Sequence, residues 1–110
     1  MNYDVITSEN FVRELKRLAK KHSSLKKDVA LLGEKLTLSP TQGTPIGNDC
    51  YKIRLAIQSK GKGKSGGARI ITAVFSVQEK VVLLSIYDKA DRENISDKEL
   101  KFLLKENTIS

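Results

Sequence analysis

The chain has 110 residues, of which 39% are hydrophobic, and its formal net charge is +7 at pH 7. This length predicts one domain over residues 1–110, and the apolar content is too high for a disordered chain. No apolar run approaches the ~18 residues that cross a membrane, and there is no signal peptide, so we expect a cytoplasmic protein without a membrane partner. The lone cysteine, Cys50, excludes an internal disulfide.

The first half of the chain predicts two amphipathic helices. After a short apolar strand at residues 3–6, Thr7 or Ser8 can cap a helix of about 13 residues. Its apolar side chains recur at helical spacing and are Phe11, Leu15, Leu18 and Ala19. A second helix begins at Ser23 or Ser24 and carries Leu25, Val29, Leu32 and Leu36 on one face. Prolines and glycines within residues 40–47 end it, so we expect a helical hairpin that packs on a sheet.

Three strands and a last helix follow. Apolar and polar residues alternate through residues 51–58, which is the period of a half-buried strand, so Lys52 and Arg54 project from the same face. Residues 69–77 and 80–87 are rich in β-branched residues, and the almost continuous apolar run of the second predicts a central strand.

A capping-box pattern at residues 96–99 opens the last helix. The order βααβββα predicts an α+β fold, in which an N-terminal helical hairpin packs on a small antiparallel β-sheet, with a C-terminal helix.

Positive charge is concentrated in residues 50–69, which hold four of the seven glycines and no carboxylate. The basic residues there are Lys52, Arg54, Lys60, Lys62, Lys64 and Arg69. A local excess of positive charge favours a polyanion such as RNA as partner. The glycine-rich connection alone is also typical of a mobile, solvated loop, but the flanking strands would hold their cations rigidly, as a site requires.

Several other kinds of site are disfavoured. The run Gly63-Lys64-Ser65 matches the end of a phosphate-binding P-loop, but Gln58 stands where the first glycine belongs and a strand follows instead of a helix. His22 is the only histidine, which excludes a two-histidine ribonuclease mechanism and indicates a surface or capping residue. Asp88 opens an acidic turn with alternating charges, typical of a solvated segment. No ligand spacing suggests a metal, and we expect no cofactor.

Three segments together resemble the RelE/ParE superfamily of toxins from type II toxin–antitoxin systems, closest to its HigB-like/RelE branch. The segments are Tyr51-Lys52-Ile53-Arg54, the glycine–lysine run 60–69, and Ile86-Tyr87-Asp88-Lys89. The resemblance covers nearly the whole chain, and the glycine–lysine run is its most specific part. It implies a ribosome-dependent mRNA endoribonuclease, an mRNA interferase, held inactive by a cognate antitoxin protein. In this reaction the 2′-hydroxyl of the message attacks the neighbouring phosphate.

The resemblance also implies residue roles. Lys52, Arg54 and Arg69 fall on strand positions where the family carries active-site cations. Arg54 and Arg69 are expected to stabilise the transition-state phosphate, and Lys52 is a candidate proton acceptor. The residues expected to hold message and ribosomal RNA are Lys60, Lys62, Lys64, Lys89 and Arg92.

Two positions depart from the family pattern. Ala90 stands where the best-known members carry an arginine, and Ser96 stands where they carry a tyrosine. Arg92 and Tyr87 are candidate substitutes. Two alternatives therefore stay open: a ParE-like poison of DNA gyrase, and a catalytically weak RNA- or partner-binding module on the same fold.

Overall fold

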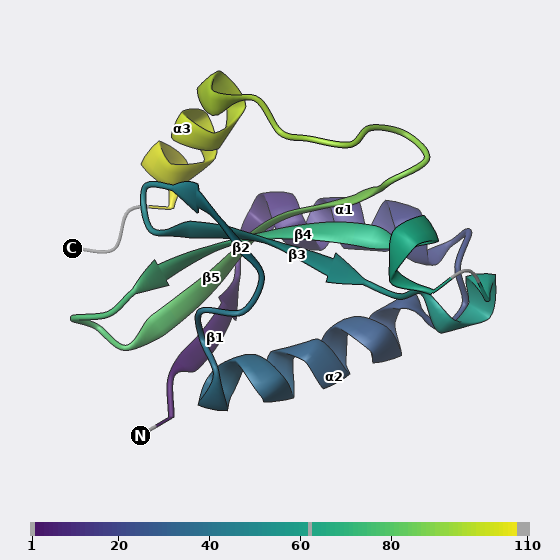
Figure 1. Ribbon diagram of the computed structural model, residues 1–110, viewed down its shortest axis with the longest axis horizontal. Helices are drawn as coiled ribbons and strands as arrows, with labels where there is room; N and C mark the ends of the chain where they lie inside the picture. Colours follow the sequence, from purple (N-terminus) through teal and green to yellow (C-terminus); the bar gives the residue numbers. More distant parts are fainter. Residues whose placement is uncertain (1, 62, 108–110) are drawn as a thin grey trace.

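The computed structural model describes residues 2–61 and 63–107, in which helices cover both faces of a five-stranded sheet (Figure 1). The helices are α1 (Glu9–Ala19), α2 (Leu25–Leu38) and α3 (Asp97–Glu106). The strands are β1 (Asp4–Thr7), β2 (Thr44–Gly47), β3 (Cys50–Leu55), β4 (Ala68–Phe75) and β5 (Lys80–Asp88). Two short 3-10 turns, η1 (Gln58–Lys60) and η2 (Lys64–Gly66), lie between β3 and β4. None of the helices in these residues has the length and apolar character needed to cross a bilayer.

Serine side chains begin two of the helices, as the sequence predicts. The Ser8 hydroxyl accepts a hydrogen bond from the Phe11 N–H at 3.0 Å, and the Ser96 hydroxyl accepts one from the Glu99 N–H at 3.1 Å. Each bond satisfies a first-turn N–H that has no partner inside its helix.

The sheet has the strand order β1-β5-β4-β3-β2. The predicted α+β class, helical hairpin and C-terminal helix are confirmed, but the sheet is mixed, because β1 pairs with β5 in parallel. Such a pair requires a long crossover connection, which the hairpin and the following strands supply. The edge strand β2 was not predicted, because its proline and glycine favour a loop; a short edge strand tolerates both.

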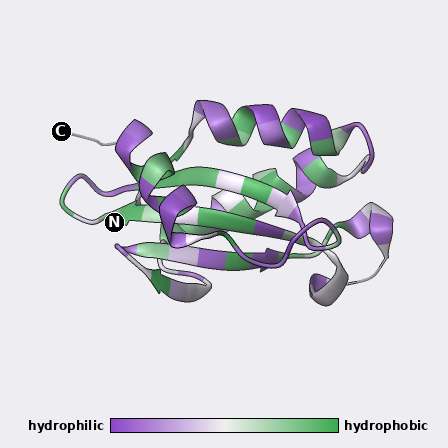
Figure 2. Ribbon diagram, turned by 90° about the horizontal axis from the view of Figure 1, so that it is seen from above, coloured by the Kyte–Doolittle hydropathy of each residue, from purple (hydrophilic) through white to green (hydrophobic). Residues whose placement is uncertain are grey.

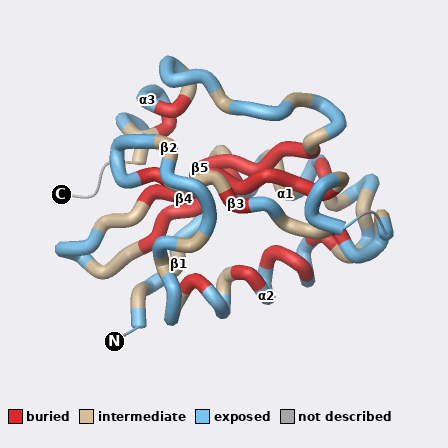
Figure 3. The backbone as a smooth tube through the Cα atoms, viewed as in Figure 1, coloured by how far each residue is buried: buried red, intermediate tan, exposed pale blue. Residues whose placement is uncertain are grey.

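Two apolar layers hold the helices to the sheet. The α1–α2 hairpin packs on one face, where the buried residues include Phe11, Leu25, Leu36, Ile70 and Val81. The helix α3 packs on the other face, where the buried residues include Ile71, Val82, Leu84, Leu100 and Leu103. Figure 3 shows buried backbone concentrated in the central strands, and Figure 2 shows polar residues on the outer surfaces of the helices. The whole of residues 81–88 is buried, which confirms the predicted central strand.

Side chains of α1 complete the outer edge of β5 where β1 ends. β1 pairs with β5 only as far as Leu83, and the next carbonyl, that of Leu84, accepts from Asn10 Nδ2 at 3.0 Å. One oxygen of Glu14 then accepts from the Ser85 hydroxyl at 2.8 Å and from the Ile86 N–H at 3.2 Å.

A register shift between β4 and β5 lies at the same point. A bulge of this kind changes the alternation of side chains. Val82 and Leu84 belong to the α3 layer, yet Ile86 belongs to the hairpin layer. As a result Tyr87 faces α3, whereas Asp88 faces the hairpin.

Candidate active site

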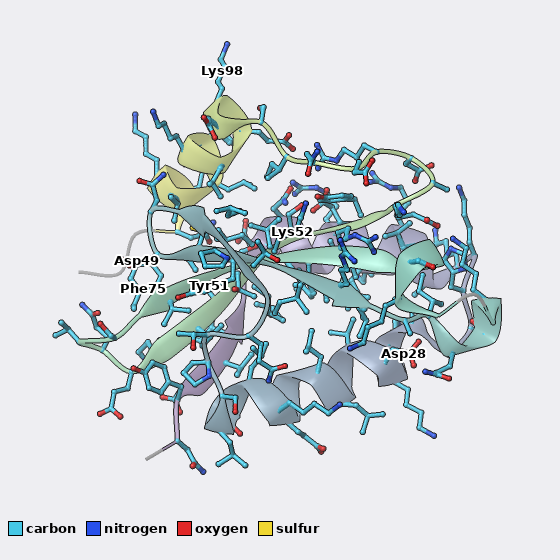
Figure 4. All side chains as sticks on the ribbon, viewed as in Figure 1. Asp28, Asp49, Tyr51, Lys52, Phe75 and Lys98 are labelled. Atoms are coloured by element: carbon cyan, nitrogen blue, oxygen red, sulfur yellow. The ribbon has the colours of Figure 1, made fainter. Side chains whose placement is uncertain are left out.

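The three predicted catalytic cations lie on one face of the sheet. Arg54 of β3 is directly opposite Arg69 of β4, which is directly opposite Tyr87 of β5. Directly opposed residues of antiparallel strands share a face, so these side chains form one row across the sheet. Lys52 precedes Arg54 by two residues and lies on the same face. Figure 4 shows Lys52 on the side of the sheet nearer α3, whereas Asp28 is on the α2 side.

Arg69 is anchored by the connection between β3 and β4 that contains η1 and η2, called here the glycine–lysine loop. Its residue exposure is only 3%, and its Nη1 donates to the carbonyls of Lys64 at 2.9 Å and of Ala68 at 3.1 Å. No carboxylate within the described residues pairs with it. Within the described residues, its Nε and Nη2 donate to no protein acceptor. A guanidinium fixed through one nitrogen keeps further N–H groups with which it can bind an anion.

Two guanidinium groups directly opposite each other are electrostatically unfavourable. The pairing of Arg54 with Arg69 therefore costs stability in the free protein and would be relieved by an anion between them. Arg54 is exposed, so its charge is available to such a ligand.

A groove of about 490 Å³ adjoins this row, between α2 and the outer edge of β3. Four cations line it together with an apolar floor: Lys35, Lys52, Arg54 and Lys64. Lys52 also donates to Asn94 Oδ1 at 2.7 Å, which ties it to the segment before α3. The groove and the cation row thus form one basic surface.

The far end of the row is closed by an aromatic–cation pair. The Tyr87 hydroxyl donates to the Glu93 carbonyl at 3.1 Å, and the Arg92 guanidinium lies 4.5 Å from the centre of the Tyr87 ring. Burial raises the pKa of Tyr87 despite the nearby Arg92 and Arg69, so its hydroxyl stays protonated at neutral pH. The 2.7 Å hydrogen bond to Glu99 raises the pKa of Arg92 further and occupies one of its nitrogens.

The predicted RNA-binding residues differ in their exposure to solvent and in their partners. Lys64 is exposed, whereas Lys60 is ion-paired with Asp88 at 3.0 Å. Lys89 is half-buried, and its backbone N–H donates to Gly67. Arg92 is paired with Glu99, as described above. Lys62 lies outside the described residues.

Two sequence interpretations are wrong. Asp88 is not part of a solvated turn: it is buried and accepts hydrogen bonds from Lys60, from Ala90 N–H at 2.9 Å and from His22 Nε2 at 3.1 Å. His22 is therefore a half-buried partner of Asp88, not a surface or capping residue. Burial raises the pKa of the Asp88 carboxyl, but the hydrogen bonds from Ala90, Lys60 and His22 outweigh it and hold the pKa below its ordinary value.

Comparison with known proteins places the chain in a family. Residues 5–109 match the family model described as the RelE toxin of the RelE/RelB toxin–antitoxin system. The chain belongs to the RelE toxin family. The match spans both the hairpin and the cation row, and it confirms the resemblance drawn from residues 51–54, 60–69 and 86–89. The protein is thus a RelE-family toxin of a type II toxin–antitoxin system.

Solved structures of RelE proteins share the fold of this RelE toxin. A doubly substituted variant of Escherichia coli RelE in its free state is 22% identical, with a TM-score of 0.62, over 96% of this chain and 97% of that chain. The toxin–antitoxin complex RelBE2 from Mycobacterium tuberculosis is 20% identical, with a TM-score of 0.61, over 83% and 95%. Isolated E. coli RelE is 20% identical, with a TM-score of 0.54, over 94% and 97%.

The two residues that differ from the family pattern, Ala90 and Ser96, have structural roles in this RelE toxin. The Ala90 N–H supports Asp88, and the Ser96 hydroxyl caps α3, so neither supplies a side chain to the cation row. Within the described residues, no three carboxylate, histidine or cysteine side chains converge as metal ligands. The side chains of the row and its neighbour on β3 are those of lysine, arginine and tyrosine.

Proposed function

We propose that this RelE toxin is a ribosome-dependent endoribonuclease that cleaves mRNA by attack of a 2′-hydroxyl on the adjacent phosphate. The observation that carries the proposal is the row in which Arg54 and Arg69 are directly opposed, with no carboxylate of the described residues paired to either. The products are a 2′,3′-cyclic phosphate and a free 5′-hydroxyl. Membership of the RelE family supports the same reaction class.

Each cation has a role that its position supports. The Arg69 N–H groups that have no protein acceptor and the exposed guanidinium of Arg54 bind the non-bridging oxygens of the scissile phosphate, whose negative charge increases in the transition state. Lys52 lies on the same strand as Arg54 and lines the same groove. In its neutral amine form it accepts the proton of the 2′-hydroxyl, and the leaving 5′-oxygen takes up a proton from water. Removing one such preorganised charge costs ~10²–10³ in rate.

RNA binding outside the row is assigned to Lys64, which is exposed and lines the groove. Lys62, Lys89 and Arg92 are further candidate ligands of message and ribosomal RNA. Arg92 must release Glu99 to bind RNA. Contacts with phosphates make binding fall steeply with salt, because counterions are released.

The test is cleavage of a defined mRNA on purified ribosomes, followed by mapping of the cut ends. Wild-type protein should cut in phase with codons, and Arg54→Ala and Arg69→Ala should each lose at least about 100-fold in rate. Lys16→Ala, which removes an exposed cation on the other side of the sheet, is the matched control. Intact message with wild-type protein would refute the proposal, and DNA damage in cells without mRNA cuts would support the gyrase alternative.

We also propose that a cognate antitoxin inhibits this protein through an acidic segment in the groove beside β3. The M. tuberculosis relative is a toxin–antitoxin complex. In this chain β2 pairs with β3 only from Cys50 to Lys52, so the edge from Ile53 onward has no strand beside it. Such an edge can pair with an extended peptide, and the basic rim of the groove favours acidic residues.

Co-expression with the neighbouring reading frame tests this site. Leu31→Asp introduces a negative charge into the groove, where Leu31 is 48% exposed, and should weaken the complex. Val77→Asp makes the same change at a residue that is 90% exposed outside the groove, and should leave the complex intact. Equal affinity of both variants would place the antitoxin elsewhere.

A further inference from the structure

On the face of the sheet opposite the cation row, the buried carboxylate of Asp88 is hydrogen-bonded to residues outside β5, one of which lies in the glycine–lysine loop. Asp88, at the end of β5, is 7% exposed. It accepts hydrogen bonds from His22 after α1, from the Ala90 N–H and from the Lys60 ammonium. Because it faces the hairpin, it cannot touch an RNA phosphate bound at the cation row.

The Lys60 ammonium extends this junction into the loop. Besides Asp88, it donates to the Gly66 carbonyl at 2.8 Å, within the single turn η2. The first residue of that turn, Lys64, supplies the carbonyl that accepts from Arg69 Nη1. A short series of contacts therefore runs from Asp88 through Lys60 and η2 to the Arg69 guanidinium.

We propose that Asp88 is a positioning residue for Arg69, and that Lys60 is a structural cation instead of an RNA ligand. The proposal rests on the proposed function for the catalytic role of Arg69. A single 3-10 turn among glycines is weak by itself, because glycine loses the most backbone freedom on ordering. The Lys60–Asp88 pair supplies the external tether that holds η2 over Arg69.

Loss of the tether should affect the rate of the chemical step more than RNA binding. Without it the Lys64 carbonyl is no longer fixed, and Arg69 keeps only the Ala68 carbonyl of its own strand as an acceptor. A catalytic group displaced by about 1 Å can lose ~10²-fold in rate. The exposed cations that attract RNA are unchanged, so affinity should persist.

Single-turnover cleavage of ribosome-bound mRNA by full-length variants tests the proposal. Asp88→Asn and Lys60→Met should lower the maximal rate by about 10- to 100-fold while the half-saturating protein concentration changes less than about twofold. Lys60→Arg keeps a cation that can bridge Asp88 and Gly66, and should retain most of the rate. The control Lys64→Met, at an exposed loop lysine, should raise the half-saturating concentration. It should also reduce the salt slope, which is the slope of log affinity against log salt concentration, by about one unit.

Hydrogen exchange of the amides of residues 64–67 gives a readout that needs no activity. Exchange should accelerate in Asp88→Asn and Lys60→Met but not in Lys64→Met. The proposal is overturned if exchange is unchanged in both tether variants, or if Lys60→Met behaves like Lys64→Met in half-saturation and salt slope. If the wild-type protein does not cleave RNA, the proposed function fails, and the exchange data still decide whether the tether exists.

Discussion

Replacing Arg54 by threonine should make the protein more stable and nearly inactive. Arg54 is directly opposite Arg69, and like charges in this arrangement destabilise a sheet by about 0.5–1 kcal/mol. Threonine removes the repulsion and is well suited to a strand. For a chain of this size, the gain corresponds to an increase in Tm of about 2–5 °C. The cleavage rate should fall by ~10²-fold, because one preorganised charge is lost.

Thermal unfolding followed by circular dichroism, at low and high salt, measures the stability change. The gain from Arg54→Thr should shrink at high salt, because salt screens the exposed guanidinium. Lys16→Gln removes the same unit of net charge from an exposed position on α1 and should show no comparable gain. The reasoning is wrong if Arg54→Thr melts at or below the wild-type temperature at low salt.

Three further substitutions test the surroundings of the site. Because the pKa of Asp88 is lowered by folding, its stabilisation is complete above its ordinary pKa of about 3.9 and is lost as the pH falls below it. Asp88→Asn should therefore cost about 2 kcal/mol at pH 7 and progressively less below about pH 4. Glu14→Ala should cost about 1–3 kcal/mol, because the Ile86 N–H loses its acceptor, whereas Glu14→Gln should cost less than half of that. Gly67→Ala should cost about 3 kcal/mol, since a Cβ there would overlap the Leu55 carbonyl.

Denaturant unfolding measures the free energy of unfolding of the variants at all three positions, with Gly33→Ala as the control for glycine replacement. A Cβ at Gly33 meets nothing within 4 Å, so this helical change should instead stabilise the protein by about 0.5–1 kcal/mol. If the loss of stability in Asp88→Asn does not change with pH, the carboxyl group of Asp88 is not ionised in the way assigned here. Equal losses for Glu14→Ala and Glu14→Gln would show that the acceptor oxygen is unimportant.

The local patterns in the sequence predict most of the fold. Serine caps at Ser8 and Ser96 and the helical period of the hairpin depend on neighbouring residues, and each is confirmed. The strand predicted at residues 51–58 is confirmed as far as Leu55, but Gln58 belongs to the 3-10 turn η1. The same strand period put Lys52 and Arg54 on one face. The parallel pairing of β1 with β5 was missed, because it joins residues 76 positions apart and leaves no local signal.

Long-range pairing also explains what sequence reasoning missed at the site. Asp88 looks like any acid in a charged turn, and its partners His22 and Lys60 lie 66 and 28 residues away. The burial of Arg69 depends on η2 folding back over β4, which the glycines permit but do not specify. The one usable signal was indirect: Asp88 directly follows the almost continuous apolar run 81–87, and an acid that is buried at the end of such a run needs a partner.

A double-mutant cycle of Arg54 and Arg69 on the single-turnover cleavage rate tests most directly whether the two guanidinium groups act on one phosphate. If they do, the loss in Arg54→Ala/Arg69→Ala should be clearly smaller than the product of the two single losses, because each charge depends on the other for its effect. Multiplicative losses, or single variants that cleave at the wild-type rate, would contradict a shared phosphate site on this face of the sheet.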